Sequence, residues 1–318
     1  MKKILLTILF SANVLALETD NYLAWDIQLD DSSQKINQYL EEQIHIGLSE
    51  ANAKREIQSC FDVTKKIASR FKAKFVHDNP VEKWLRLHLD HGQYYPDTMN
   101  YVQKSLYRVP FRFYIPKFGL AQNIQVNDIY FGMDKLTHFT WTARNYFLIF
   151  INEIKNQKSP QEATQSAIQY GLLDELTLHG FWASGVYSYA DLEANYQGLL
   201  FYKNFCFSGK DNYLRLNEIQ KWELVRRPHI EDYISPKWDE SYNLSYFLPE
   251  NWTKIAPTLS SNYCSLRQSP KVVQRFNFYR NFKPKSFSEN YIDSLHKQNN
   301  FFTPFDKNQS LENLCPTN

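Results

Sequence analysis

The chain has 318 residues, a formal net charge of +2 at pH 7 and 16% aromatic residues. A chain of this length can bury one large core or two smaller ones. Its balanced charge argues against general nucleic-acid binding, which depends on many contacts between basic side chains and phosphates. We therefore expect no nucleic-acid partner. Most aromatic residues are expected to pack the core, although such side chains also stack on sugar rings.

The first 16 residues have the pattern of a cleavable secretory signal. Lys2 and Lys3 form its positive start, and the apolar stretch 4–15 is shorter than the ~20 residues of a membrane-spanning helix. Ala16 is small enough to precede a cleavage site. Removing the signal takes away two lysines and no acid, so the formal charge falls to about zero. The mature chain, 17–318, is expected to be periplasmic or secreted and to contain no transmembrane span.

Four cysteines lie in the mature chain, namely Cys60, Cys206, Cys264 and Cys315. None forms a CxxC pair, so a zinc knuckle is not expected. In an oxidising compartment, an even number of well-spaced cysteines predicts one or two disulfides. The spacing leaves all three pairings open, and free buried thiols are the alternative.

Apolar spacing and capping residues predict a mainly α-helical single domain, with a helical core at about 130–206 and a tail at about 299–318. Helices are expected at 31–48, 51–75, 136–154, 159–179 and 188–205, with a further one starting at Ser269-Pro270. Aromatic residues and prolines between 94 and 128 indicate strands or a packed loop. The helices at 159 and 188 begin with a capping box or a sequence that resembles one.

Three pairs of polar residues in this core are each four positions apart: Asp134 and His138, Glu175 and His179, and Asp191 and Asn195. On a helix this spacing puts both side chains of a pair on one face. The surrounding sequence is apolar, where carboxylates and imidazoles are costly unless they pair or bind something. We therefore expect neighbouring helices to gather these residues, with Ser188, around one polar pocket.

Simpler interpretations exist for single residues. Asp134 can be an N-cap, and Asp191 is at the third helical position of a capping box, which explains an acid there. His138 and His179 can be hydrogen-bonded core residues. Capping does not explain Glu175, His179 and Asn195 together, and their joint occurrence favours a site.

The polar residues also follow one another in a recognisable order. The order is Asp134-Lys-x-x-His138-Phe, then Glu175, then Gly-x-x-Ser188-x-x-Asp191-x-x-Ala-Asn195-x-x-Gly. This pattern resembles that of VanZ-like proteins and is similar to that of YfiM-type exported lipoproteins, over about 130–205 only. VanZ-like proteins are membrane-embedded and the lipoproteins carry a lipid-bearing cysteine, and this chain has neither feature. The resemblance implies an envelope setting and a site at these six positions, without naming a reaction.

The first of three functional hypotheses is an envelope protein that binds a metal ion or an envelope-derived ligand and acts as a hydrolase. The proposed metal ligands for zinc or manganese are Asp134, His138, Glu175 and His179. A metal-bound water would be the nucleophile. Glu175, His138 and Asp191 would be the catalytic residues, and Ser188 and Asn195 would bind the ligand.

The second hypothesis is a metal-free, lysozyme-like glycan hydrolase. Glu175 would be the general acid, with Asp191 or Glu193 as the second carboxylate. The third is a non-catalytic envelope scaffold in which the same residues form a structural hydrogen-bond network. Cell-wall glycans and lipid-linked precursors are the ligands that an envelope setting would supply.

Overall fold

The computed structural model describes residues 19–54, 56, 58–72, 79–96, 105–108, 120–177, 180–181, 185–282, 284–300 and 302–315. Within these residues the protein is mainly helical, as predicted, with a few short strands and irregular connections. The predicted signal at 1–16 lies outside the described residues. The boundaries of the single domain stay predictions.

The helices account for most of the described chain. The α-helices are α1 (Ser33–Asn52), α2 (Cys60–Arg70), α3 (Pro80–His88), α4 (Asp134–Thr137), α5 (Ala143–Lys155), α6 (Pro160–Leu176), α7 (Tyr189–Lys203), α8 (Pro249–Tyr263), α9 (Pro270–Arg280), α10 (Phe287–Lys297) and α11 (Leu311–Leu314). A π-helical turn, η5 (His138–Thr142), joins α4 to α5. Short 3₁₀ turns are η1 (Asn21–Ala24), η3 (Leu106–Arg108), η6 (Gly209–Asp211), η7 (Ile230–Asp232), η8 (Pro236–Trp238) and η9 (Leu266–Gln268).

The strands are short and pair in three small antiparallel sheets. They are β1 (Tyr94–Tyr95), β2 (Asn123–Val126), β3 (Ile129–Gly132), β4 (Val186–Tyr187), β5 (Leu214–Leu216), β6 (Trp222–Leu224) and β7 (Tyr246–Phe247). The first sheet has the order β1-β2-β3, and β4 pairs with β7 and β5 with β6. The β4–β7 pair matters for the site, because it ties the start of α7 to the C-terminal third.

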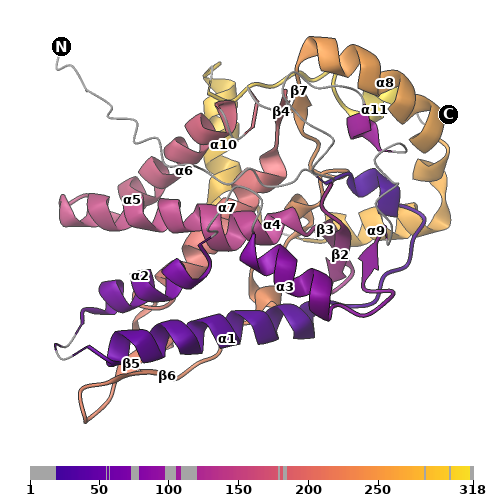
Figure 1. The fold of residues 1–318 in the computed structure, drawn as a ribbon. Helices are drawn as coiled ribbons and strands as arrows, with labels where there is room; N and C mark the ends of the chain where they lie inside the picture. The colour runs from indigo at the N-terminus through magenta and orange to yellow at the C-terminus, as the bar shows by residue number, and fades with distance from the viewer. Residues whose placement is uncertain are drawn as a thin grey trace.

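Two groups of helices meet at α4, which contacts both α3 and α7 (Figure 1). In one group, α5 packs against α6 and α7. In the other, α1 packs against α2 and α3, and α3 contacts α4. One hydrophobic cluster runs through both groups, from Tyr22 to Cys315. It encloses α4 and the start of α7, which carry the polar residues of interest.

The predicted helices of the central region are confirmed, with small changes at their ends. The segment predicted at 136–154 is one continuous helical rod formed by α4, η5 and α5. At the start of α6, the Ser159 hydroxyl accepts from the Glu162 amide and the Glu162 carboxylate accepts from the Ser159 amide, which is a complete capping box. α9 starts at Pro270 as expected, with Ser269 as its N-cap.

The helix predicted at 51–75 is wrong at its start. α1 continues to Asn52, and a separate helix, α2, begins at Cys60. The Ser59 hydroxyl accepts a hydrogen bond from the Asp62 amide, so Ser59 is the N-cap of α2. The two predicted helices are therefore separate, as expected, but the break between them lies after Asn52 and not after Leu48.

All four cysteines are paired, which resolves the open pairing. Cys60 bonds to Cys206 and Cys264 bonds to Cys315, with Cα–Cα distances of 6.0 and 5.2 Å. The first disulfide joins the start of α2 to the segment after α7. The second fastens the C-terminal tail to the end of α8.

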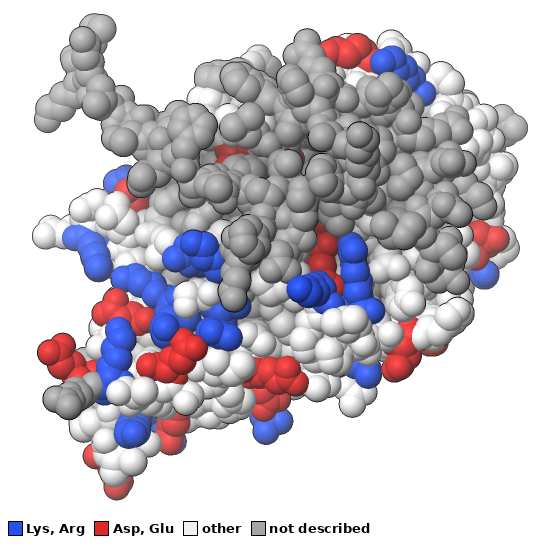
Figure 2. Space-filling view, viewed as in Figure 1, with Lys and Arg blue, Asp and Glu red and all other residues white. Residues whose placement is uncertain are grey.

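The surface of the described residues carries mixed charges. Figure 2 shows basic and acidic side chains interspersed over the part of the surface near α1 and α2. Pairs such as Lys66 with Glu50 and Arg70 with Glu50 contribute to this mixture. Separately, none of the helices in the described part of the chain is both long and apolar enough to cross a membrane.

Candidate functional site

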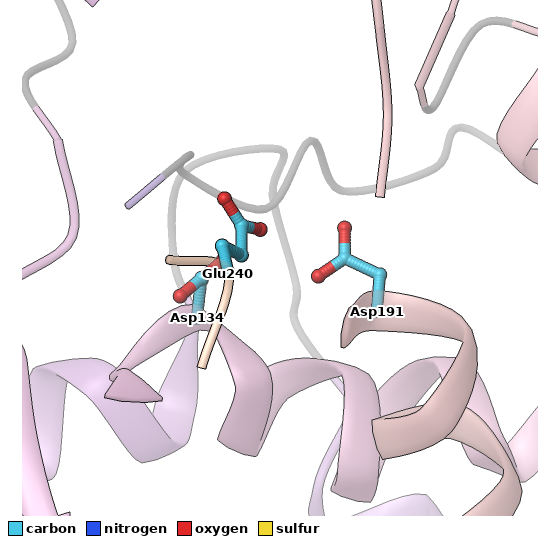
Figure 3. Close-up of side chains that lie close together, drawn as sticks. All are labelled: Asp134, Asp191 and Glu240. Carbon is cyan, nitrogen blue, oxygen red and sulfur yellow. The ribbon is translucent and has the colours of Figure 1, made fainter. Parts of the chain in front are cut away.

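Three carboxylates from distant parts of the chain meet beside the helical core. Asp134 opens α4, Asp191 lies in the first turn of α7, and Glu240 follows η8 in an irregular segment. One oxygen from each lies within 4.8 Å of the other two. Figure 3 shows Asp134 and Glu240 side by side, with Asp191 facing them from the first turn of α7.

The ammonium of Lys135 occupies the point between these carboxylates. Its Nζ atom lies 2.6 Å from an oxygen of Asp134, Asp191 and Glu240 alike. The side chain is 0% exposed, so the ammonium has lost its hydration. A buried charge is tolerated only when it is paired, and here three carboxylates replace water. We call Asp134, Lys135, Asp191 and Glu240 the Lys135 centre.

Hydroxyl groups satisfy further oxygens of the centre. Thr19 Oγ1 donates to Asp134 Oδ1 at 2.5 Å. Glu240 accepts from Ser188 Oγ at 2.9 Å and from Tyr107 Oη at 3.2 Å. These bonds hold Asp134 and Glu240 in place as well as stabilising their charge.

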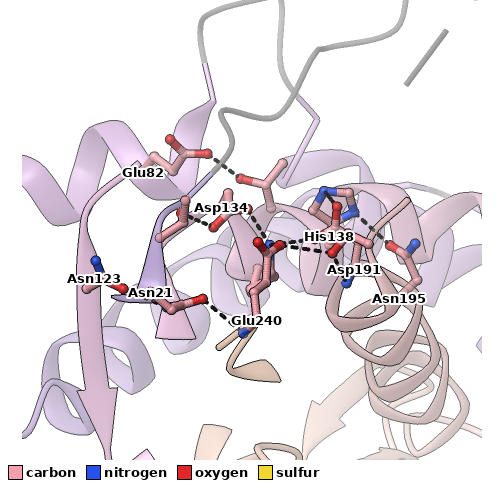
Figure 4. A network of polar contacts seen from close by, with 12 residues as sticks. Asn21, Glu82, Asn123, Asp134, His138, Asp191, Asn195 and Glu240 are labelled. Atoms are coloured by element: carbon pink, nitrogen blue, oxygen red, sulfur yellow. Dashed lines mark hydrogen bonds and ion pairs between the residues drawn. The ribbon is translucent and has the colours of Figure 1, made fainter. Parts of the chain in front are cut away.

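His138 lies beside the centre and is engaged through both ring nitrogens. Nε2 is 3.3 Å from Asp191 Oδ2, and Nδ1 is 3.3 Å from the side-chain oxygen of Asn195 (Figure 4). Each ring nitrogen therefore already has a polar partner within the protein.

Asp191 illustrates how the site departs from simple capping. The Ser188 hydroxyl accepts from the Asp191 amide at 3.1 Å, which caps α7. The Ser188 amide donates to Glu175 and not to Asp191, so no capping box forms. The Asp191 carboxylate pairs with Lys135 and His138. The interpretation of Asp191 as only a capping-box acid is therefore wrong.

Glu175 joins the network through the backbone. The Ser188 amide donates to Glu175 Oε1 at 2.8 Å, while the Ser188 hydroxyl bonds to Glu240. The chain after α6 folds closely over Glu175, since a Cβ built on Gly180 would lie 2.6 Å from Glu175 Oε1. Only a residue without a side chain fits this approach.

The predicted site residues thus converge, with one exception. Six of the seven lie in a single contact network: Asp134, His138, Glu175, Ser188, Asp191 and Asn195. His179 lies outside the described residues. The oxygens that could together hold a cation come from Asp134, Asp191 and Glu240, which is not the predicted ligand set, and the Lys135 ammonium already lies among them. A zinc or manganese ion stays a prediction.

Sequence reasoning missed two members of the centre. Lys135 stood inside the quoted motif but was given no role, because lysine is almost always exposed. Glu240 lies 105 residues away in an irregular segment, where no spacing pattern marks it. Tyr107 and Thr19 were also missed, and no local signal distinguishes them.

The charges of the centre shift the pKa values of its acids in opposite directions. Burial favours the neutral form of Asp191, but the nearby His138 and Lys135 outweigh burial and lower its pKa. Burial raises the pKa of Glu240 despite Lys135, and the carboxylates of Asp191 and Asp134 add to the rise. The centre therefore holds one firmly ionised acid and one that gains a proton more readily.

Other buried acids lie around this region. Burial raises the pKa of Glu82 to about 7, and nearby Asp134 adds to the effect. Glu82 accepts from Thr137 Oγ1 at 2.8 Å on α4. Burial likewise raises the pKa of Asp20 to about 6 and that of Glu193 to about 7.

These shifts predict that mild acid stabilises the fold. An acid whose pKa is raised by folding binds its proton more tightly in the folded state, so its contribution is present at low pH and is lost as the pH rises through the folded pKa. For Glu82 and Glu193, this stabilising contribution begins to fall above the ordinary glutamate pKa and is gone once the pH passes their folded pKa of about 7. The loss amounts to about 3 kcal/mol of unfolding free energy for each residue at most. At more acidic pH, Asp191, with its lowered pKa, reverses the trend.

Melting temperatures measured from pH 5 to 8 check this prediction. The melting temperature should fall as the pH rises, and Glu82→Gln should flatten the fall. Glu218→Gln is the matched control, because Glu218 is exposed. A profile that rises towards pH 8 would contradict the assigned protonation.

Comparisons with known proteins assign this chain to no family. No protein family, no curated protein and no solved structure matches this chain. The likeness to VanZ-like and YfiM-type proteins therefore stays a resemblance of short motifs.

Proposed function

We propose that this chain is an exported, non-catalytic protein of the cell envelope, in which the Lys135 centre is a structural charge network. One observation carries the proposal: a fully buried lysine lies 2.6 Å from each of three carboxylates. This ammonium takes the position that a bound cation would need. Asp134 and Glu240 also accept hydroxyl hydrogen bonds, which fits a network built to be satisfied internally.

The arrangement of the network supports a scaffolding role. It links α4, the start of α7 and the segment after η8, which lie far apart in the sequence. Buried ion pairs of this kind add little net stability over apolar packing, but removing one partner is strongly destabilising, so each charge needs its partners in place. We infer that the centre fixes how the C-terminal third docks onto the helical core.

The envelope setting rests on two independent features. The N-terminal pattern is that of a secretory signal, and both disulfides suit an oxidising compartment. Periplasm or secretion is therefore part of the proposal.

The experiment compares the structural role with the metal and hydrolase hypotheses. Purified mature protein should contain no stoichiometric zinc or manganese, and its melting temperature should not change with EDTA. His138→Ala should lower the melting temperature by several degrees, since the Asp191 and Asn195 oxygens each lose a partner. A peptidoglycan suspension should keep its turbidity with wild-type protein.

Two results would overturn the proposal. One is a bound metal that His138→Ala removes. The other is clearing of the peptidoglycan suspension that Glu175→Gln abolishes without a change in melting temperature. The matched amide substitution is Glu223→Gln, because Glu223 lies on β6 with its side chain 38% exposed and pairs there with Arg215, away from the Lys135 centre. This control should change neither the metal content nor the turbidity.

A further inference from the structure

A strip of basic side chains lies along α2 and α5 and shares no residue with the Lys135 centre. Lys65 lies on α2, and Lys72 follows the end of this helix seven positions later, which is the spacing of side chains on one face. On α5, Arg144 and Lys155 are eleven positions apart and also share a face. α2 packs against α5, and Figure 2 shows basic side chains close together over this region. We call Lys65, Lys72, Arg144 and Lys155 the basic strip.

One end of the basic strip lies at Trp141. Lys72 Nζ is 5.8 Å from the centroid of the Trp141 ring, and Arg144 Cζ is 5.7 Å from it. A cation–π contact of this kind orients a cation without neutralising it. Neither Lys72 nor Arg144 forms an ion pair with a described residue. Both charges are therefore available to an anionic partner.

The other end lies at the start of α2. Lys65 Nζ is 3.1 Å from an oxygen of Asp62. The hydrogen bond from Ser59 and the charges of Lys65 and Lys155 lower the pKa of Asp62, so Lys155 approaches this carboxylate from α5. Asp62 balances one of the two lysines, and the exposed Lys155 forms no ion pair with a described residue. The start of α2 thus lies beside the end of α5.

The flank of the strip adds to its positive charge. Lys66 and Arg70 of α2 both pair with Glu50 of α1, so one carboxylate serves two cations. On α5, Glu153 is taken up by Lys158. Counted over the described residues, the strip and this flank have six cations and two carboxylates, which leaves four positive charges in excess. A surface of this kind attracts anions.

The length of the strip favours a partner with many anionic groups. Arg144 and Lys155 are separated by eleven residues, or about 16 Å along the axis of α5. One small anion does not reach both ends at once. A phospholipid bilayer does, because it presents phosphate groups side by side across a plane. Lys72 and Lys155 are both exposed, which suits contact with a flat partner.

We propose that the basic strip binds the phosphate groups of an anionic phospholipid bilayer. Clusters of about four to eight lysines and arginines on amphipathic helices bind anionic lipids through attraction to the negatively charged surface. The protein would lie on the bilayer with α2 and α5 towards the headgroups. The proposal shares only the envelope setting with the function proposed above, because the Lys135 centre contributes no residue to the strip.

Co-sedimentation of the mature protein with vesicles tests the proposal. At low salt the protein should sediment with vesicles of equal parts phosphatidylglycerol and phosphatidylcholine, and this binding should weaken as the salt concentration rises. Vesicles of phosphatidylcholine alone should bind at least about tenfold more weakly, because they carry no net charge. Equal binding to both kinds of vesicle would overturn the proposal. So would saturable binding of tripolyphosphate or of a DNA duplex without binding to vesicles.

Two double variants locate the site. Lys72→Gln/Arg144→Gln and Lys65→Gln/Lys155→Gln each remove both cations from one end of the strip. Each should weaken binding to the anionic vesicles about 25-fold, which is about fivefold for each charge removed. Unchanged binding in both variants would refute the assignment to the strip. Melting curves confirm that each variant is folded.

A matched control separates the strip from the net charge of the protein. Lys254→Gln/Lys297→Gln removes the same charge from two exposed lysines on α8 and α10, which contribute nothing to the strip. This control should leave binding to the anionic vesicles nearly unchanged. A loss equal to that of the strip variants would show that net charge alone drives binding, and the assignment would be wrong.

Discussion

Replacing Lys135 with methionine is expected to lower the free energy of unfolding by about 3–5 kcal/mol, because removing one partner of a buried ionic cluster leaves uncompensated charge. Methionine keeps most of the length of the lysine stem, so little packing is lost. What disappears is the ammonium that faces Asp134, Asp191 and Glu240. Three buried carboxylates would then repel one another without a cation between them.

Thermal and urea unfolding measure this loss, which corresponds to a fall in melting temperature of roughly 10 °C. Lys66→Met is the matched control, since Lys66 also contacts a carboxylate, at 2.8 Å, but is 40% exposed. A surface pair of that kind contributes less than about 1 kcal/mol. Equal effects of the two substitutions would show that the Lys135 centre is no more important than a surface ion pair.

The same centre allows a rescue experiment. Lys135→Ala removes the stem as well and opens space between three carboxylate oxygens that all lay 2.6 Å from one point. Calcium binds oxygen ligands at about 2.3–2.6 Å. Calcium should therefore raise the melting temperature of Lys135→Ala and leave wild-type protein unchanged. If calcium raised the melting temperature of wild-type protein as strongly, the Lys135 ammonium would not fill the position between the three carboxylates.

The fold was predictable where local signals agree. α6 and α7 start at Ser159 and Ser188 because each serine hydroxyl accepts from the amide three residues later, and both starts were found. The break before α2 was predicted too early, at 49–50, because Ile57 continues the apolar spacing of the second helix towards its N-terminus. The cap at Ser59 decides the break, and a single serine is a weak signal against a long apolar pattern.

The site was predictable only in its local part. His138 and Asn195 were found because each stands four residues after an acid on a helix. Their mutual contact, and the contact of Asp191 with Lys135, depend on how α4 and α7 pack. Glu240 approaches through an irregular segment, so no periodicity relates it to Lys135. Contacts across 105 residues are set by tertiary packing, which one sequence does not reveal.

The two disulfides are also long-range contacts. Removing them is expected to cause the second large loss of unfolding free energy. The Cys60–Cys206 disulfide spans 146 residues, against 51 for Cys264–Cys315. A cross-link restricts the unfolded chain more when it closes a longer loop, and the loop lengths correspond to about 5 and about 4 kcal/mol. The longer disulfide also joins the α1–α2 group of helices to the α5–α7 group.

The double variant Cys60→Ser/Cys206→Ser should therefore lose up to about 5 kcal/mol of unfolding free energy, and Cys264→Ser/Cys315→Ser somewhat less. Double variants avoid a lone thiol that could form a wrong disulfide. Urea unfolding of both variants beside wild-type protein measures the two losses. Because the cross-link acts on the unfolded chain, the variants should also unfold with a steeper urea dependence, as more surface is exposed. Wild-type stability in the Cys60→Ser/Cys206→Ser variant would mean that the packing of α2 on α5 already fixes the two helical groups without the covalent link.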